Sequence, residues 1–125
     1  MDSSLLKARE NWYQAFFSGN TQLMEEIEAE SFLVLNEYGA QTKQEQLSGI
    51  ASALRAGKWF PSGTSKQDSS IHIQENESFS VVSGKGLTLI GGNLKKAPIF
   101  FSEVWCNTAG SWKVLHLHYT SVKNG

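Results

Sequence analysis

The spacing of apolar residues changes along this chain of 125 residues, and that change most limits what it can fold into. As far as Gly57, apolar residues mostly recur every three or four positions, which is typical of amphipathic helices. From Ser70 onward they alternate with polar residues or form short runs, which is typical of strands. Helices followed by strands favour an α+β fold over alternating α/β units. The length fits one domain, residues 1–125.

The first half of the chain predicts three helices and one strand. Thr42-Lys43-Gln44-Glu45 is the clearest helix start, because Thr42 and Glu45 can satisfy each other's backbone amides in a capping box. Glycines that follow apolar helical stretches predict helix ends. The expected elements are a helix over residues 3–18 ended by Gly19, a short helix after Asn20 or Thr21, a strand over Ser31–Asn36, and a helix from Thr42 to Gly57.

The second half predicts an antiparallel series of strands. Ser83–Gly86 is expected to be a turn, and the pair Gly91-Gly92 is expected to bend a strand, as glycines in strands often do when a sheet curls. Three helices followed by a curled antiparallel sheet is therefore the predicted order. The expected strands are Ser70–Gln74, Phe79–Val82, Leu87–Lys95, Ile99–Asn107 and Ser111–Val122.

The last two strands indicate which side chains face inward. A four-residue loop over 107–110 would place Cys106 opposite Ser111. One face then carries Ile99, Phe101, Glu103, Trp105, Trp112, Val114, His116 and His118, and the other carries Phe100, Ser102, Val104, Lys113, Leu115, Leu117 and Tyr119. Both faces are rich in apolar residues, so helices should cover one face and another subunit the other. This pattern predicts a homodimer that packs through the outer face of the sheet.

Composition excludes several classes of function. The net charge is −1 and the 11 Lys and Arg residues are scattered, so no nucleic acid is expected as a partner. No apolar run approaches the ~20 residues of a membrane span, and the N-terminus lacks the basic and apolar regions of a signal peptide, which favours the cytoplasm. Cys106 is the only cysteine, so no disulfide forms within the chain, and it is expected to be a small strand residue.

Several segments together resemble a known family. They are residues 12–20 (Trp-Tyr-Gln-Ala-Phe-Phe-Ser-Gly-Asn), Phe32 to Gly39, and a closing hairpin made of residues 101–105 and 110–120. In this order and spacing they resemble the nuclear transport factor 2-like superfamily, in its ketosteroid isomerase-like and SnoaL-like branch. The resemblance implies a cone-shaped curved sheet closed by the three N-terminal helices, often dimeric, with a pocket inside the cone.

The resemblance does not carry over the isomerase residues of that branch. Alignment on Gly19 places Trp12 where such enzymes have a tyrosine donor, and Tyr13 lies one position away. Asn36 stands where they have an aspartate base, and an amide cannot accept the proton. Members of this fold include enzymes, transport adaptors and assembly domains, so the fold does not decide the function.

His116 and His118 are the candidate catalytic groups, together with Glu103. Their i, i+2 spacing on one strand points both histidines to the same side, about 7 Å apart. The predicted register turns them into the cone beside Glu103, which could orient a histidine base. The alternatives are structural histidines or ligand contacts without chemistry. Although His-x-His is also a metal-ligand spacing, no further glutamate follows the pair, so neither a metal nor a cofactor is expected.

Aromatic residues should supply the rest of the pocket. Trp59 and Phe60 lie in a loop, where they either cover the pocket mouth or pack on the third helix. Asn36 either binds a polar ligand group or caps its turn. The predicted ligand-binding residues are Trp12, Phe16, Asn36, Trp59, Phe60, Phe101, Glu103, His116 and His118.

Three functions follow from this pattern. The first is binding of a small apolar or amphipathic molecule without strong catalysis. The second is an isomerase, dehydratase or hydrolase with His118 or His116 as base. The third is a dimerisation or assembly module whose pocket is filled.

Overall fold

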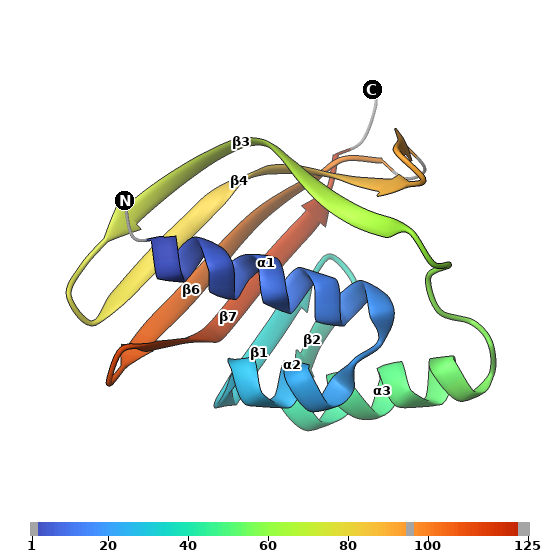
Figure 1. Cartoon of the computed structure of the whole chain (residues 1–125), viewed down its shortest axis with the longest axis horizontal. Coiled ribbons are helices and arrows are strands. Elements are labelled where there is room, and N and C mark those ends of the chain that lie inside the picture. The colour runs from blue at the N-terminus through green and yellow to red at the C-terminus, as the bar shows by residue number, and fades with distance from the viewer. Residues whose placement is uncertain (1–2, 95–96, 123–125) are drawn as a thin grey trace.

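A computed structural model describes residues 3–94 and 97–122 of the chain. This part contains three helices and a large curved sheet that does not close, which confirms the α+β prediction. Figure 1 shows α1 running across the strands, with α2 and α3 at the end where β1 and β2 lie. The helices are α1 (Ser3–Ser18), α2 (Thr21–Ile27) and α3 (Lys43–Arg55), and the strands are β1 (Glu28–Asn36), β2 (Gly39–Thr42), β3 (Thr64–Glu75), β4 (Phe79–Ile90), β5 (Asn93–Leu94), β6 (Ile99–Thr108) and β7 (Ser111–Ser121).

Helices α2 and α3 begin where their capping residues predict. The Asn20 side chain accepts from the Leu23 amide at 3.2 Å. At the start of α3, the Glu45 amide donates to Thr42 Oγ1 at 3.2 Å and the Thr42 amide donates to Glu45 Oε1 at 2.9 Å. The capping box is therefore complete, and two backbone amides that a helix leaves unpaired are satisfied.

The sheet is mixed rather than wholly antiparallel. Its strand order is β2-β1-β7-β6-β4-β3, with β5 paired to β4. β1 and β7 run parallel, with Val34 beside Leu117, and the other pairs are antiparallel. The chain leaves β1 for α3 and the long β3–β4 hairpin before it returns as β7, and such a long connection permits parallel pairing. The antiparallel prediction was wrong at this one pair.

The glycines in and after β4 have other roles than those predicted. Ser83–Gly86 is not a turn, because β4 continues through it. A side chain at Gly84 would collide with the Ser70 carbonyl oxygen, next to a register shift between Asp68 and Ser70 that marks a β-bulge. Gly91-Gly92 forms the turn between β4 and β5 rather than a bend within one strand. Lys95, the predicted end of that strand, lies outside the described residues.

The register predicted for the last hairpin was also wrong. The turn has two residues, Ala109 and Gly110, both with positive φ, and it places Thr108 opposite Ser111. This slip of two residues leaves the inward face of Trp112 and Val114 unchanged, because side chains alternate with period two. A register shift between Val104 and Trp105 then inserts one extra residue in β7.

That extra residue reverses the direction of every later side chain of β7. Leu117 is buried opposite Glu103, and Tyr119 lies opposite Phe101 on the inner face. His116 pairs with Val104 and His118 with Ser102, on the outer face of the sheet. The prediction that both histidines face into the cone is therefore wrong, since a one-residue insertion exchanges the two faces of a strand.

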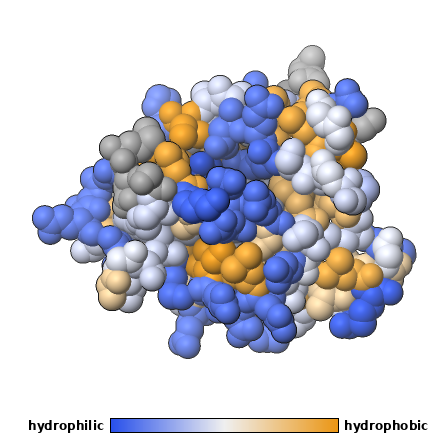
Figure 2. Space-filling model, viewed as in Figure 1, coloured by the Kyte–Doolittle hydropathy of each residue, from blue (hydrophilic) through white to orange (hydrophobic). Residues whose placement is uncertain are grey.

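The core lies between α1 and the inner face of the sheet. Its largest side chains with less than 2 % exposure include Trp105, Phe32, Leu5 and Met24, and also two carboxylates, Glu28 and Glu103. Figure 2 shows hydrophilic residues over much of the helix side, with smaller hydrophobic patches between them. Within residues 3–94 and 97–122, no helix has the length and apolar character to cross a membrane.

Candidate functional site

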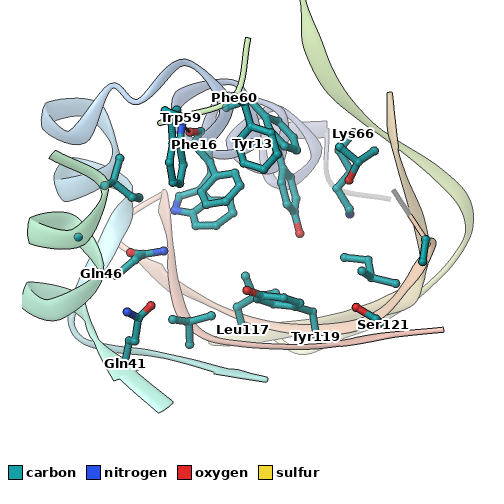
Figure 3. Close-up of a pocket in the computed structure, with 18 residues that line it drawn as sticks. Tyr13, Phe16, Gln41, Gln46, Trp59, Phe60, Lys66, Leu117, Tyr119 and Ser121 are labelled. Atoms are coloured by element: carbon teal, nitrogen blue, oxygen red, sulfur yellow. Dashed lines mark hydrogen bonds between the residues drawn. The ribbon is translucent and has the colours of Figure 1, made fainter. Parts of the chain in front are cut away.

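A cavity of about 690 Å³ lies inside the cone. Helix α1 supplies one wall, β7 with the neighbouring strands supplies the floor, and α3 and the segment before β3 supply the remaining sides. Figure 3 shows Tyr13 and Lys66 on one side of the space and Leu117, Tyr119 and Ser121 on the other. The lining residues are Trp12, Tyr13, Phe16, Phe17, Val34, Gln41, Gln46, Gly49, Ile50, Trp59, Phe60, Lys66, Thr88, Ala97, Ile99, Leu117, Tyr119 and Ser121.

Aromatic rings form one end of the cavity. Phe16 stacks on Trp12 with ring centroids 5.5 Å apart, and Trp59 meets the edge of Phe16 at 5.2 Å. Trp59 Nε1 also donates to the Phe16 carbonyl oxygen at 2.8 Å, and the ring centroids of Phe60 and Phe17 are 5.0 Å apart. The loop residues Trp59 and Phe60 therefore both line the cavity and pack on the end of α1. The hydrogen bond of Trp59 and the ring contacts of both residues hold them in place.

Behind this wall, Arg9 and Glu103 form a buried ion pair. Arg9 on α1 is 5 % exposed and Glu103 on β6 is 1 % exposed. Arg9 Nε donates to Glu103 Oε1 at 2.6 Å, and Arg9 Nη2 donates to Glu103 Oε2 at 2.9 Å. This two-pronged geometry suits guanidinium and carboxylate groups, and it fixes the position of α1 over the sheet.

Two aromatic donors complete the environment of Glu103. The Tyr13 hydroxyl donates to Glu103 Oε2 at 2.6 Å, and Trp105 Nε1 donates to Glu103 Oε1 at 2.8 Å. Burial first, and then the negative charge of Glu103, raise the pKa of Tyr13 well above its ordinary value of 10.0. Tyr13 lines the cavity with its ring, but its hydroxyl proton is committed to Glu103.

Among the described residues that line the cavity, Lys66 is the one with a charged side chain. Its side chain is 5 % exposed, and Nζ lies 3.6 Å from the centroid of the Phe101 ring and donates to Asp68 Oδ1 at 2.8 Å. A Cβ at Gly86 would lie 2.7 Å from Lys66 Cε, so that glycine leaves room for the lysine. Burial lowers the pKa of Lys66, although Glu103 and Asp68 oppose the shift.

Asp68 links the lysine to the buried ion pair. Arg9 Nη1 donates to Asp68 Oδ2 at 3.0 Å. Burial alone would raise the pKa of Asp68, but hydrogen bonds from Arg9 and Lys66 outweigh it and hold the pKa below the ordinary value of 3.8. The four groups Arg9, Lys66, Asp68 and Glu103 thus pair two positive charges with two negative ones.

Asn36 acts on the cavity through Tyr119. Its Oδ1 accepts from the Tyr38 amide at 2.8 Å, and its Nδ2 donates to the Tyr119 hydroxyl oxygen at 2.9 Å. Asn36 does not itself line the cavity, whereas Tyr119 does. The side chain therefore both caps its turn and positions a hydroxyl at the cavity floor.

A second buried carboxylate, Glu28, lies beside two lining residues. Trp12 Nε1 donates to Glu28 Oε2 at 3.0 Å. With its NH₂ turned toward Glu28, the Gln46 amide donates to the two carboxylate oxygens at 3.1 and 2.7 Å. Burial raises the pKa of Glu28 from 4.5 to about 7, against the opposing effects of Trp12 and Lys43.

The predicted site residues thus separate into three groups. Trp12, Phe16, Trp59 and Phe60 line the cavity, and Asn36, Phe101 and Glu103 lie directly behind lining residues. His116 and His118 lie on the outer face of the sheet because of the bulge in β7, and neither lines the cavity. Within residues 3–94 and 97–122, no three His, Cys, Asp or Glu side chains gather in a way that could hold a metal ion.

Sequence reasoning missed Arg9, Lys66 and Tyr119. Arg9 could have been found, because it interrupts the apolar face of α1 four residues after Leu5, while Glu103 interrupts the inner face of β6. Two opposite charges on two buried faces indicate a buried pair, since a lone buried charge is very costly. Lys66 and Tyr119 carried no such signal, since both depend on bulges in β3 and β7.

The raised pKa of Glu28 predicts a pH-dependent stability. Between about pH 4.5 and 7 the folded protein holds a proton on Glu28 that the unfolded chain releases. The contribution of Glu28 to the free energy of unfolding therefore falls as the pH rises through this range, by up to about 3 kcal/mol, and stays level above it. We expect Glu28→Gln to remove this part of the decline, as measured by urea unfolding at about pH 5 and pH 8.

Glu30→Gln is the matched control, because Glu30 is exposed on the same strand. Its pH profile should follow that of the unmodified protein. A Glu28→Gln variant with the same decline as the unmodified protein would show that Glu28 titrates at its ordinary pKa.

The comparisons with known proteins bear on the fold. No protein-family model matches the chain, and no curated protein matches it. Among solved structures, a candidate dehydratase of the nuclear transport factor 2-like family from Streptomyces avermitilis has 15 % identity and a TM-score of 0.78, covering 98 % of this chain and 96 % of its own.

Two further nuclear transport factor 2-like structures are similar over almost their whole length. One, from Cytophaga hutchinsonii, has 16 % identity and a TM-score of 0.75, covering 98 % of this chain and 100 % of its own. The other, of unknown function in nutrient uptake, from Rhodospirillum rubrum, has 22 % identity and a TM-score of 0.74, covering 95 % of this chain and 98 % of its own. The chain therefore has the nuclear transport factor 2-like fold.

Proposed function

We propose that this protein binds a small, largely apolar and uncharged molecule in the cavity inside the cone. The observation that carries the proposal is an open cavity of about 690 Å³ whose walls are mostly aromatic and aliphatic. Small-molecule sites usually have volumes of roughly 300–1,000 Å³ and combine such walls with a few placed polar groups. The polar groups here are those of Tyr13, Gln41, Gln46, Lys66, Thr88, Tyr119 and Ser121.

The pairing of charges favours an uncharged ligand. Lys66 already donates to Asp68, and Arg9 already holds Glu103 with two hydrogen bonds. A charged ligand would lose its hydration without gaining an unpaired partner at the cavity wall, which is costly in an apolar site. An apolar ligand gains roughly 25 cal/mol for each Å² that it removes from water.

The other two functions have less support in the geometry. A histidine base would have to reach the cavity, but His116 and His118 lie on the opposite face of the sheet. An assembly module with a filled pocket does not agree with a cavity of this volume. Solved structures with this fold include proteins of unknown function and a candidate dehydratase, so the fold alone does not choose between them.

A variant that blocks the cavity tests this proposal. Gly49 on α3 lines the cavity, and a Cβ there would meet nothing within 4 Å, so Gly49→Phe can extend into the open space. We expect it to weaken binding of the neutral fluorescent probe N-phenyl-1-naphthylamine by at least roughly tenfold, because it removes apolar volume from the site. Fluorescence titration measures the Kd.

Ser48→Phe is the matched control, because Ser48 is exposed on the same helix and does not line the cavity. It should bind the probe as the unmodified protein does. No saturable binding by the unmodified protein, or equal weakening in both variants, would contradict a site in the cone.

We also propose that two copies pair through the outer face of the sheet. No described helix covers this face, and it presents Leu33, Leu35, Val81, Phe100 and Val104 around the two histidines. Phe100 is 56 % exposed. An apolar surface of this kind on a single chain favours a protein–protein contact.

Sedimentation at micromolar concentration checks the dimer. We expect the mass of two chains for the unmodified protein and of one chain for Val104→Lys, because the new charge would be buried without a partner. Gln14→Lys, on the exposed side of α1, should leave the dimer intact. A single-chain mass for the unmodified protein would refute the proposal.

A further inference from the structure

We infer that the polar end of the ligand is a carbonyl oxygen, and that the hydroxyl of Tyr119 binds it. The inference rests on the proposed function and specifies its ligand: an uncharged ketone, aldehyde, ester or amide on an apolar body. It follows from the hydrogen bonds around Asn36 and from the position of Tyr119 at the cavity floor.

The orientation of the Asn36 amide is fixed from outside the cavity. Its Oδ1 accepts from the backbone amide of Tyr38 at 2.8 Å, in the turn between β1 and β2. A backbone N–H can only donate, so the oxygen of the amide must face Tyr38 and the NH₂ must face Tyr119. Asn36 Nδ2 then donates to the Tyr119 hydroxyl oxygen at 2.9 Å.

The proton of Tyr119 is left to point elsewhere. The hydroxyl oxygen accepts from Asn36, and an NH₂ group cannot accept in return. Among residues 3–94 and 97–122, the Tyr119 side chain makes one hydrogen bond, the one that it accepts from Asn36. The arrangement therefore holds a donor at the floor of the cavity with its acceptor still to be supplied.

The neighbours of Tyr119 decide what kind of acceptor fits. On the floor, Tyr119 lies between the lining residues Leu117 and Ser121 on the inner face of β7. Figure 3 shows Tyr119 across the space from Tyr13 and Lys66. Tyr13 gives its proton to Glu103, whereas Lys66 Nζ donates to Asp68 and lies against the rings of Tyr13 and Phe101.

A carbonyl oxygen suits this position better than a hydroxyl or a carboxylate. It accepts without bringing a proton of its own that would need an acceptor in apolar surroundings. A carboxylate would bring a charge into a site where the charged groups are already paired. The aromatic rings of Phe16, Trp59 and Phe60 at another side of the cavity favour a flat apolar body.

Two probes of the same shape test the inference. The ketone 2-acetylnaphthalene and the hydrocarbon 2-isopropenylnaphthalene differ in one oxygen, which the hydrocarbon replaces with a methylene group. The unmodified protein should bind the ketone roughly tenfold more tightly, which is the effect of one net hydrogen bond in an apolar site. Tyr119→Phe should bind both equally, and its affinity for the hydrocarbon should be unchanged. Calorimetry gives the Kd values.

Infrared spectroscopy gives a readout that a purely structural role would not move. The C=O stretch of bound 2-acetylnaphthalene should lie at lower frequency in the unmodified protein than in Tyr119→Phe, because a hydrogen bond to the oxygen lowers the stretching frequency of a carbonyl. Tyr38→Phe is the matched control, because Tyr38 is 92 % exposed, and it should behave as the unmodified protein.

Asn36→Asp tests the positioning role. Aspartate keeps the acceptor for the Tyr38 amide, but its second oxygen accepts from Tyr119 instead of donating to it. The Tyr119 proton would then turn away from the ligand. We expect the roughly tenfold preference for the ketone to disappear although the Tyr119 hydroxyl is still present.

The outcomes separate this inference from the proposed function. If both probes bind the unmodified protein and Tyr119→Phe with the same affinity, the cavity binds apolar molecules and the carbonyl inference is overturned. If neither probe binds the unmodified protein, the proposed function is itself overturned. A ketone preference that survives Tyr119→Phe would assign the donor role to another residue and also overturn the inference.

Discussion

The buried pair of Arg9 and Glu103 connects the two layers of this fold. It joins α1 to β6 across 94 positions of sequence, with two hydrogen bonds of 2.6 and 2.9 Å. Tyr13 and Trp105 donate to the same carboxylate, so a helix and a strand share one set of hydrogen bonds. Breaking a buried pair by removing one partner is strongly destabilising, because the other charge is left without compensation. The helix is therefore held at one angle and depth over the sheet.

The cavity depends on that fixed distance between the layers. Helix α1 supplies one wall of the space through its aromatic residues, and Gly86 contributes no side chain where Lys66 lies. The two buried carboxylates serve different purposes, because their partners differ. Glu103 is matched by Arg9, whereas Glu28 has only neutral donors in Trp12 and Gln46, so its charged form is disfavoured. Apart from Lys66, which is paired with Asp68, charge thus lies in the wall behind the cavity, which suits an uncharged ligand.

The order of helices and strands could be predicted from the sequence, because periodicity and capping are local properties. The capping box at Thr42 and the inward direction of Phe101, Glu103 and Trp105 are confirmed. The direction of His116 and His118 could not be predicted, since a bulge one residue long reverses a strand and leaves no clear pattern in the sequence. For the same reason Tyr119, predicted to face outward, lies on the cavity floor. The parallel pairing of β1 with β7 is a tertiary choice that no local pattern encodes.

The central claim is that the Arg9–Glu103 pair acts as a unit that holds α1 to the sheet. A double-mutant cycle with Arg9→Met and Glu103→Leu, followed by urea unfolding, tests it most directly. Each single change should lower the free energy of unfolding by about 3–5 kcal/mol, because it leaves one buried charge or its donors unpaired. The double variant should lose clearly less than the sum of the two, since apolar side chains then face each other. Losses that simply add would contradict the account, because the two residues would then stabilise the fold independently.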